Sequence, residues 1–294
     1  MRLEFYTMPF VVYSLGALVS YNYNNFFFLP NYLIGYLVLF LIELATVLTN
    51  EYYDFEADKL NKNVGRFTGG SRMLIENKIS PREVRCSIAF VLFIIFISSS
   101  YLFIITLFSN QVLFLLLIGV ILGVSYTAPP LKLSYRGLGE LDVAFIHGFY
   151  VIFCGYVFQK GILDFQVIMP ISIPIFFSSL AGVSLAGLPD IKSDIIVSKK
   201  SIAVLIGPKK SLYLSMICSI ITGIYGIFLW QFFISWHFSY LYLLIPIYSL
   251  ILGYIILRLI KTDRIDLEID KLIMMAMFMI SLSSFIPFIL VFLN

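Results

Sequence analysis

Long apolar segments follow one another along almost the whole chain, separated by short polar stretches. A helix needs about 20 mainly apolar residues, and at least about 17, to cross a bilayer. The segments that meet this requirement cover residues 5–22, 31–51, 83–107, 111–127, 139–159, 165–188, 210–232, 238–259 and 271–292. The pattern predicts an all-α integral membrane protein with nine transmembrane helices around a central cavity. If the polar run at 109–111 were a kink inside one helix, the count would be eight.

The composition agrees with this pattern. Of the 294 residues, 60% are hydrophobic and 13% are charged, whereas soluble domains carry about 25% charged residues. A soluble domain could not bury so much apolar surface, so the chain is predicted to be a multi-pass protein of the cell membrane. The net charge of +3 does not indicate nucleic-acid binding. We expect one domain over residues 1–294, whose halves 1–137 and 138–294 resemble each other weakly.

The basic residues indicate the orientation of the chain. If nine helices start from a cytoplasmic amino terminus, all 20 lysines and arginines except Lys160 lie in cytoplasmic segments. This distribution follows the positive-inside rule, whereas eight helices would place the basic clusters on both sides. The outer loops are short and nearly uncharged. We therefore expect an active site at the cytoplasmic face rather than a channel, which needs polar groups along its whole path.

The first candidate site lies where the second apolar segment ends. Asn50, Asp54 and Asp58 are spaced four residues apart, so their side chains share one face of a helix. Two carboxylates and an amide supply the hard oxygen ligands that Mg²⁺ takes when it also binds a diphosphate. The alternative is a solvated helix end with ordinary surface acids.

A second pair of acids follows the sixth apolar segment. Asp190 and Asp194 repeat the four-residue spacing, and both acid pairs follow an even-numbered segment at the predicted cytoplasmic surface. Four carboxylates in one pocket would repel each other unless cations lay between them. Two facing pairs with Mg²⁺ would bind a diphosphate and neutralise its charge as it leaves. We therefore predict one metal site made from both pairs, in which the four aspartates are catalytic; the alternative is two unrelated groups of loop acids.

Basic residues follow each pair of acids. Arg72 comes after two glycines at 69 and 70, which would let backbone amides approach an anion closely. Its guanidinium could bind phosphate in a fork. Lys199 and Lys200 follow the second pair. All three are candidate phosphate-binding residues, and the alternative is a flexible linker with the usual positive charge of inner loops.

The third inner loop contains Tyr126, Lys132 and Arg136, with two prolines at 129 and 130 that end the fourth segment. These side chains lie at the same predicted level as the acids. They could border the pocket as substrate-binding residues, with Tyr126 on the acceptor side. A rigid turn with ordinary positive charge is the alternative.

Two ionisable residues lie well inside apolar segments, Glu43 and His147. Burying such a group in a membrane costs several kcal/mol unless it faces a cavity or a partner, so each is a functional candidate. Glu43 precedes Asn50 by one heptad and falls on the same helical face, which favours a catalytic role over a hydrogen bond between helices. For His147 a structural role is the main alternative.

In combination, these features resemble the UbiA superfamily of intramembrane prenyltransferases over essentially the whole chain. The matching motifs are Asn50-x₃-Asp54-x₃-Asp58 and Asp190-x₃-Asp194. Within the superfamily, residues 52–55, 69–72 and 126–140 look most like the 1,4-dihydroxy-2-naphthoate prenyltransferases of menaquinone biosynthesis. One position departs from the pattern, because many relatives carry Asn where this chain has Ala186. That departure puts the ligand set of the second acid pair in doubt.

The resemblance implies a Mg²⁺-dependent enzyme that transfers a polyprenyl group from its diphosphate to an aromatic acceptor, in particular 1,4-dihydroxy-2-naphthoate. The isoprenoid tail would lie between helices, in contact with membrane lipid. The implied roles are metal binding by Asn50 and the four aspartates, phosphate binding by Arg72 and by Lys199 or Lys200, and acceptor binding or proton removal by Glu43 or a nearby acid.

Several alternatives stay open. Other acceptors of the superfamily are 4-hydroxybenzoate, haem and a glyceryl phosphate lipid. From a different class, a transporter of a phosphorylated lipid or anion could also use paired acids beside basic residues. The sequence does not indicate an oligomeric state.

Overall fold

The computed structural model describes residues 7–60, 72–233, 235–262 and 265–294. Over these ranges the chain forms helices and no strand beyond an isolated bridge between Arg136 and Lys200. The prediction of an all-α protein is therefore confirmed.

The long helices overlap the nine predicted segments. They are α1 (Thr7–Asn24), α2 (Leu29–Tyr53), α4 (Pro81–Ile105), α5 (Asn110–Ser125), the continuous run α6 (Gly139–Phe145), η3 (Ile146–Tyr150) and α7 (Val151–Lys160), α8 (Phe165–Ala186), α11 (Pro208–Phe233), α12 (Leu244–Thr262) and α13 (Ile265–Leu293). The short elements are α3 (Phe55–Leu60), η2 (Leu133–Tyr135), α9 (Ile191–Ile196), α10 (Ile202–Ile206) and η4 (Ser239–Leu243).

The polar run at 109–111 is a turn between two helices and not a kink inside one. α4 ends at Ile105, and the hydroxyl of Ser109 accepts a hydrogen bond from the backbone N–H of Val112 as the N-cap of α5. A side-chain cap of this kind starts a new helix.

Seven helices or helical runs in the described part of the chain are long and apolar enough to cross a membrane. α5 has only 16 residues, which at 1.5 Å per residue is about 24 Å, shorter than a hydrocarbon core of about 30 Å. α1 is not among the seven either. A multi-pass membrane protein is thus supported, while the count of nine spans and the cytoplasmic amino terminus stay predictions.

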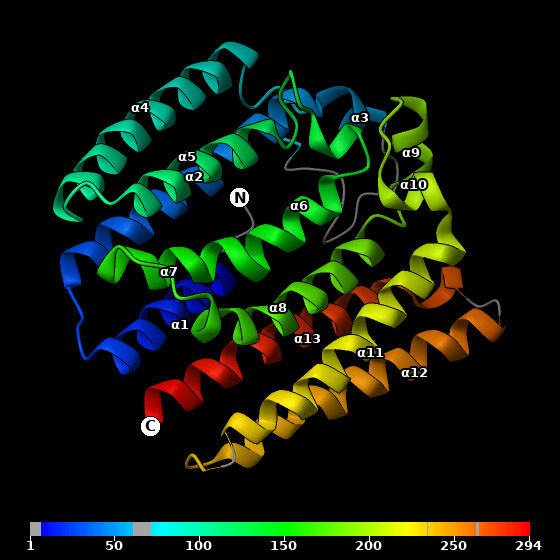
Figure 1. Cartoon of the computed structure of the whole chain (residues 1–294). Coiled ribbons are helices and arrows are strands. Elements are labelled where there is room, and N and C mark those ends of the chain that lie inside the picture. Colours follow the sequence, from blue (N-terminus) through cyan, green and yellow to red (C-terminus); the bar gives the residue numbers. More distant parts are fainter. Residues whose placement is uncertain (1–6, 61–71, 234, 263–264) are drawn as a thin grey trace.

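The helices run alongside one another in a single bundle (Figure 1). α2 packs against α4 and α5 on one side, and α8 packs against α11 and α13 on the other. Between them, α1 contacts both α7 and α13. The short helices α3 and α9 contact each other at one end of the bundle. This end is where the two motifs of paired acids are carried.

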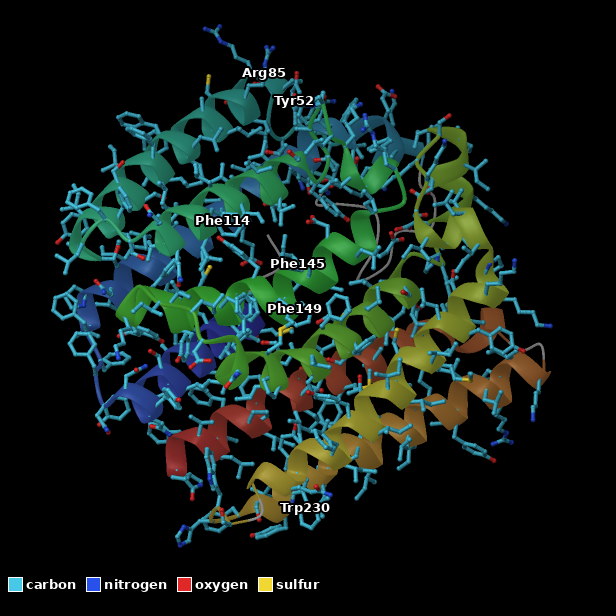
Figure 2. All side chains as sticks on the ribbon, viewed as in Figure 1. Tyr52, Arg85, Phe114, Phe145, Phe149 and Trp230 are labelled. Carbon is cyan, nitrogen blue, oxygen red and sulfur yellow. The ribbon has the colours of Figure 1, made fainter. Side chains whose placement is uncertain are left out.

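Apolar side chains cover the outside of the long helices. Figure 2 shows Phe114 on α5 and Phe145 on α6 among them, and both are exposed. Arg85 and Tyr52 lie instead toward the end of the bundle that carries α3. An apolar surface of this extent is typical of contact with lipid, because monomeric soluble proteins rarely expose large apolar patches.

α1 and α7 cross closely, and two glycines make this crossing possible. A Cβ atom at Gly16 would meet the backbone of Ile152, and one at Gly155 would meet the carbonyl oxygen of Tyr13. Small residues let helix backbones approach closely where no hydrophobic effect drives helices together. The crossing therefore depends on the absence of side chains at these two positions.

We expect Gly16→Ala to lower the free energy of unfolding by about 1–3 kcal/mol, because the added methyl group must push the two backbones apart. The control is Gly226→Ala on α11, where the new methyl would lie 3.4 Å from Pro246, an ordinary contact. That variant should be neutral or stabilising, since Ala favours helix over Gly. Thermal unfolding of the purified protein in detergent measures both, and equal stability of the two variants would contradict the account.

Candidate active site

The first acid motif stays helical through the break between α2 and α3. α2 ends at Tyr53, with Asp54 as its C-cap. The backbone N–H of Asp54 donates to the carbonyl of Asn50 (2.8 Å), and that of Asp58 donates to the carbonyl of Asp54 (2.9 Å). The four-residue register predicted for Asn50, Asp54 and Asp58 is therefore kept. Asp54 is buried, whereas Asp58 is half-buried.

The second motif is built in a similar way. α8 ends at Ala186, a short turn follows, and Asp190 is the N-cap of α9. The backbone N–H of Asp194 donates to the carbonyl of Asp190 (2.9 Å). Asp194 is buried and accepts a hydrogen bond from the hydroxyl of Ser201 (2.8 Å).

One lysine joins the two motifs. The ammonium of Lys199 lies 2.8 Å from Oδ2 of Asp54 in the first motif. Its backbone N–H donates to the carbonyl of Asp194 in the second (2.8 Å). The hydroxyl of Tyr135, from the third loop, donates to Oδ1 of Asp54 (2.9 Å). Segments about 145 residues apart along the chain thus meet at one place.

Where the two motifs meet, the negative charges of the acids outnumber the positive charge of Lys199. Burial raises the pKa of Asp58 to about 7, with further contributions from Asp54, Glu51 and Asp190 that Lys199 only partly opposes. Burial also raises the pKa of Asp194, against the effect of Lys199. A site that holds its carboxylates at raised pKa values favours added positive charge.

The charge of Lys199 itself is maintained by the acids. Burial is the largest single effect and disfavours its ammonium form, but Asp54, Tyr126 and Asp194 together outweigh burial and hold the pKa of Lys199 above its usual range. A cation is therefore already present among the carboxylates, on the protein's own side chain.

The donor set fits Mg²⁺ that shares its ligands with a substrate. Among the described residues, no three acidic, histidine or cysteine side chains converge closely enough to hold a metal ion alone. Both oxygens of Asp54 already accept hydrogen bonds. The amide oxygen of Asn50 is buried and has no hydrogen-bond partner within the described structure. Mg²⁺ commonly takes one or two carboxylates together with phosphate oxygens rather than a complete protein cage, and these residues match that mode.

The other predicted phosphate-binding residues differ in position. Arg72 is half-buried in a left-handed backbone conformation with φ 60°, and the two glycines before it lie outside the described residues. The backbone of Lys200 pairs with the third loop and its side chain is exposed. Of the two lysines, only Lys199 reaches an acid in the described structure. Lys132 lies over the ring of Tyr135, 5.2 Å from its centroid.

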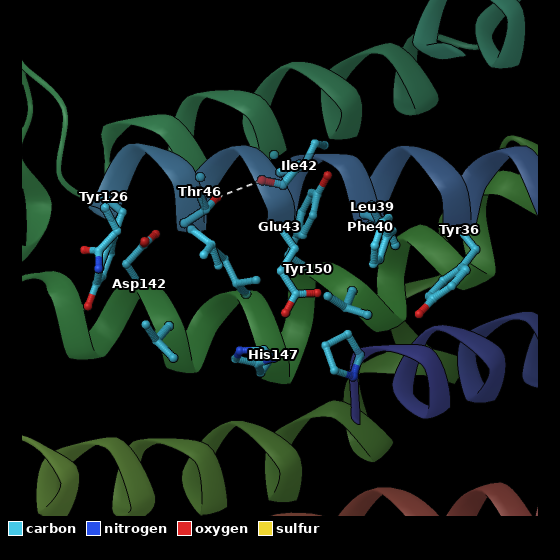
Figure 3. A pocket seen from close by; sticks show the side chains of 18 residues that line it. Tyr36, Leu39, Phe40, Ile42, Glu43, Thr46, Tyr126, Asp142, His147 and Tyr150 are labelled. Carbon is cyan, nitrogen blue, oxygen red and sulfur yellow. Dashed lines mark hydrogen bonds between the residues drawn. The ribbon is translucent and has the colours of Figure 1, made fainter. Parts of the chain in front are cut away.

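Tyr126 separates two adjoining cavities. The smaller, about 200 Å³, is polar and is lined by Asp190, Asp194 and Lys199. The other, about 260 Å³, lies deeper between the helices and is lined by Glu43, Asn50 and others; we refer to it as the chamber (Figure 3). Tyr126 lines both cavities, and burial raises its pKa to about 12, so its hydroxyl stays neutral.

A third cavity continues from the chamber. It measures about 510 Å³, shares Glu43, Val143 and His147 with the chamber, and runs between α1, α8 and α13. We call it the groove. Its α13 wall includes Met274 and Phe278, both about half exposed. The polar cavity shares Val143 and Val183 with the groove, so the three cavities all adjoin one another.

The sequence did not single out several residues of these cavities. Tyr135 and Ser201 bind acids of the two motifs, but hydroxyl side chains in loops are too common to be informative. Asp142 lines the chamber. It also lies inside the fifth apolar segment, so the cost of burying an acid in a membrane could have identified it as it identified Glu43.

Comparison with known proteins agrees with the fold and the site. Residues 9–282 match the model of the UbiA prenyltransferase family, and the chain belongs to that family. It is an enzyme family of prenyl transfer, in accordance with the predicted class. The family alone does not define the acceptor.

The curated relatives fall into two groups. The chain is 28% identical over 190 residues to the digeranylgeranylglyceryl phosphate synthase of Sulfurisphaera tokodaii, covering 64% of this chain and 62% of that one. It is 27% identical over 255 residues to the synthase of Saccharolobus solfataricus, covering 86% and 83%. It is 26% identical over 245 residues to the 1,4-dihydroxy-2-naphthoate octaprenyltransferase of Haemophilus influenzae, covering 81% and 78%. The menaquinone enzymes are thus not singled out.

Solved structures share the fold. The apo structure of a UbiA homologue from Aeropyrum pernix K1 aligns with a TM-score of 0.72 at 18% identity, over 97% of this chain and 98% of that one. A UbiA homologue from Archaeoglobus fulgidus bound to GPP and Mg²⁺ aligns with a TM-score of 0.61 at 18% identity, over 96% of both chains.

We expect Lys199→Met to lower the free energy of unfolding by at least about 1.5 kcal/mol in Mg²⁺-free buffer, since it removes a hydrogen bond between charged groups and leaves buried Asp54 without its cation. Added Mg²⁺ should then raise the unfolding temperature of this variant more than that of the unsubstituted protein. Lys200→Met, at the exposed neighbour, is the control. If both variants unfold alike with and without Mg²⁺, the ion pair has no such role.

Proposed function

We propose that this protein transfers a polyprenyl group from polyprenyl diphosphate to an aromatic acceptor of the 1,4-dihydroxy-2-naphthoate type, with Mg²⁺ as cofactor. The observation that carries the proposal is the meeting of the two acid motifs through Lys199, directly beside an apolar chamber. The diphosphate would bind at the acids and the reacting carbon would enter the chamber. We propose that this end of the bundle faces the cytoplasm, because the basic residues follow the positive-inside rule.

At the diphosphate end, Asn50 and the four aspartates would hold Mg²⁺. The homologue from A. fulgidus that was solved with GPP and Mg²⁺ supports Mg²⁺ as the cofactor. Bound Mg²⁺ would supply positive charge that neutralises the departing diphosphate. Lys199 would exchange its bond to Asp54 for bonds to phosphate oxygens, and Arg72 would bind the remaining phosphate charge.

In the chamber, the bond between the allylic carbon and the diphosphate oxygen breaks, and the acceptor ring forms the new carbon–carbon bond and loses a proton. The walls include the aromatic rings of Tyr36, Phe40 and Tyr150, whose faces can each stabilise a nearby cation by about 0.5–2 kcal/mol. Their apolar surface also excludes water, which would otherwise capture the allylic cation. Glu43, which lines the chamber, would accept the proton that the ring loses.

The groove would hold the isoprenoid tail. Its lining is mainly apolar and reaches half-exposed side chains of α13, including Met274 and Phe278. A tail that enters from the lipid would keep its apolar surface out of water at every stage. This explains why the reaction takes place inside a membrane protein.

A second candidate acceptor is a glyceryl phosphate lipid. The observation that favours it is the group of relatives that are digeranylgeranylglyceryl phosphate synthases. The groove is also large enough, at about 510 Å³, to admit part of a lipid acceptor. Mass spectrometry of products from a panel of aromatic and lipid acceptors, each offered with prenyl diphosphates of several lengths, separates these acceptors. We expect an aromatic product, and a product formed only with the lipid would reject that assignment.

We expect Asp54→Asn and Asp190→Asn each to lower kcat by about 100-fold or more, because each removes a charge that holds the diphosphate and its metal. The assay measures pyrophosphate release and prenyl transfer in the presence of Mg²⁺. A matched control is Asp164→Asn at the N-cap of α8, the end of α8 far from Asp190. This change also removes a negative charge, and Asn is itself a good capping residue. Near-normal turnover in either active-site variant would eliminate the two-motif metal site, and binding of prenyl diphosphate without pyrophosphate release would favour the transporter.

A further inference from the structure

The chamber contains three ionisable side chains that the diphosphate end does not use. Glu43 projects from α2, while Asp142 on α6 and His147 on η3 come from the facing wall (Figure 3). An isolated acid in a membrane protein is costly, and such groups usually face a partner or a cavity. Here they face the same cavity from two sides.

Two of these side chains lack partners among the described residues. Asp142 is 7% exposed, and its Oδ2 atom is buried with no hydrogen bond. The Nδ1 atom of His147 is also buried and without a hydrogen bond. Buried polar groups in native proteins are nearly always paired, so each unpaired one requires an explanation. A ligand of the chamber that brings hydrogen-bond donors is such an explanation.

Four hydroxyl side chains line the chamber, and neither Tyr36 nor Tyr126 forms a hydrogen bond with the unpaired Oδ2 atom of Asp142. The other two hydroxyl groups are already bound elsewhere. The hydroxyl of Tyr150 donates to the carbonyl of Leu115 (3.0 Å). The hydroxyl of Thr46 donates to the carbonyl of Ile42 (2.9 Å), as Figure 3 shows. Both groups are therefore bound to backbone oxygens, and Asp142 is left for another donor.

A local change of helix type directs this wall toward the chamber. Residues 146–150 form a π-helical turn between two α-helical stretches. In an ideal α-helix, the five-residue step from Asp142 to His147 turns a side chain about 140° beyond a full turn. A π turn has more residues per turn and lessens this offset, and Asp142, His147 and Tyr150 all line one cavity. π turns are rare and are frequently found at functional sites.

The charge of the chamber restricts what it can accept. Among the described residues that line it there are two acids and no lysine or arginine. A carboxylate or phosphate placed there would be repelled and would lose its hydration without compensation. The nearest cation in the adjoining polar cavity is Lys199, beyond Tyr126. The chamber therefore suits an uncharged edge of a molecule, and its aromatic walls suit a ring.

We propose that Asp142 and His147, facing Glu43, bind the hydroxyl groups of an aromatic diol acceptor and make this enzyme specific for that class. The inference rests on the proposed prenyl transfer and adds the acceptor's chemistry to it. Any anionic substituent of the acceptor is directed out of the chamber, toward Lys199. Asp142 and His147 line one wall and Glu43 lines the opposite wall, so a hydroxyl group on either side of the ring meets a hydrogen-bond acceptor.

The test is a double-mutant cycle between the protein and the acceptor. The unsubstituted protein and Asp142→Asn are assayed with 1,4-dihydroxy-2-naphthoate and with its two mono-O-methyl ethers. A hydrogen bond to a charged group contributes about 1.5–3 kcal/mol, so Asp142→Asn should raise the acceptor KM about 10- to 100-fold. With the unsubstituted protein, the KM for one of the two ethers should exceed the KM for the diol by a similar factor. Asp142→Asn should raise the KM for that ether little further. The KM for prenyl diphosphate should change less than about twofold.

Controls separate binding from folding. Asp164→Asn carries the same change at the far end of α8 and should leave every constant unchanged. His147→Gln, which keeps hydrogen-bonding capacity, should have a lower acceptor KM than His147→Leu, which removes it. If Asp142→Asn does not fold, the comparison of the two His147 variants tests the proposal instead.

The possible failures are distinguishable. If no acceptor is prenylated, the proposed function fails together with the inference. If 1,4-dihydroxy-2-naphthoate is prenylated but Asp142→Asn leaves its KM unchanged, the inference is wrong and prenyl transfer stands. The same conclusion follows if each methyl ether still raises the acceptor KM in the Asp142→Asn variant. Transfer only to a glyceryl phosphate lipid likewise overturns the diol site while leaving prenyl transfer intact.

Discussion

The ion pair between Lys199 and Asp54 is the interaction on which the site depends. Four carboxylates brought together from two distant segments repel one another, and burial increases that repulsion because the surroundings screen it poorly. Lys199 lies 2.8 Å from Asp54, and its backbone is bonded to Asp194. The lysine therefore neutralises part of the charge and connects the end of α2 to the loop after α9 at the same time. The same lysine also lines the polar cavity, beside Asp190 and Asp194.

The three adjoining cavities connect that contact to the apolar outer surface of α13. Acids and lysine line the polar cavity, Tyr126 stands between it and the chamber, and the groove continues to half-exposed side chains of α13. A molecule with a charged head, a reactive carbon and an apolar tail fits this sequence of environments in one orientation. The polarity of the lining thus positions such a molecule before any specific hydrogen bond is considered.

Local spacing made part of the site predictable. The helical register of Asn50, Asp54 and Asp58 survives the break after α2 because two backbone hydrogen bonds span it. The choice between Lys199 and Lys200 was not predictable, since it depends on the pairing of the Lys200 backbone with the third loop. The position of His147 was not predictable either, because a π turn redirects that stretch and apolar periodicity alone assumes α-helix. The all-helical fold followed from composition, whereas α5 is too short for sequence length to settle the number of spans.

The glycine crossing of α1 and α7 has a consequence for the groove. With no side chains between their backbones at Gly16 and Gly155, α1 packs closely against α7, and Thr7 and Met8 of α1 form one side of the groove. The opposite side belongs to α13, where Met274 and Met277 present unbranched, adaptable side chains. If the groove holds the isoprenoid chain as proposed, the methionines of α13 would adapt to chains of different girth or length.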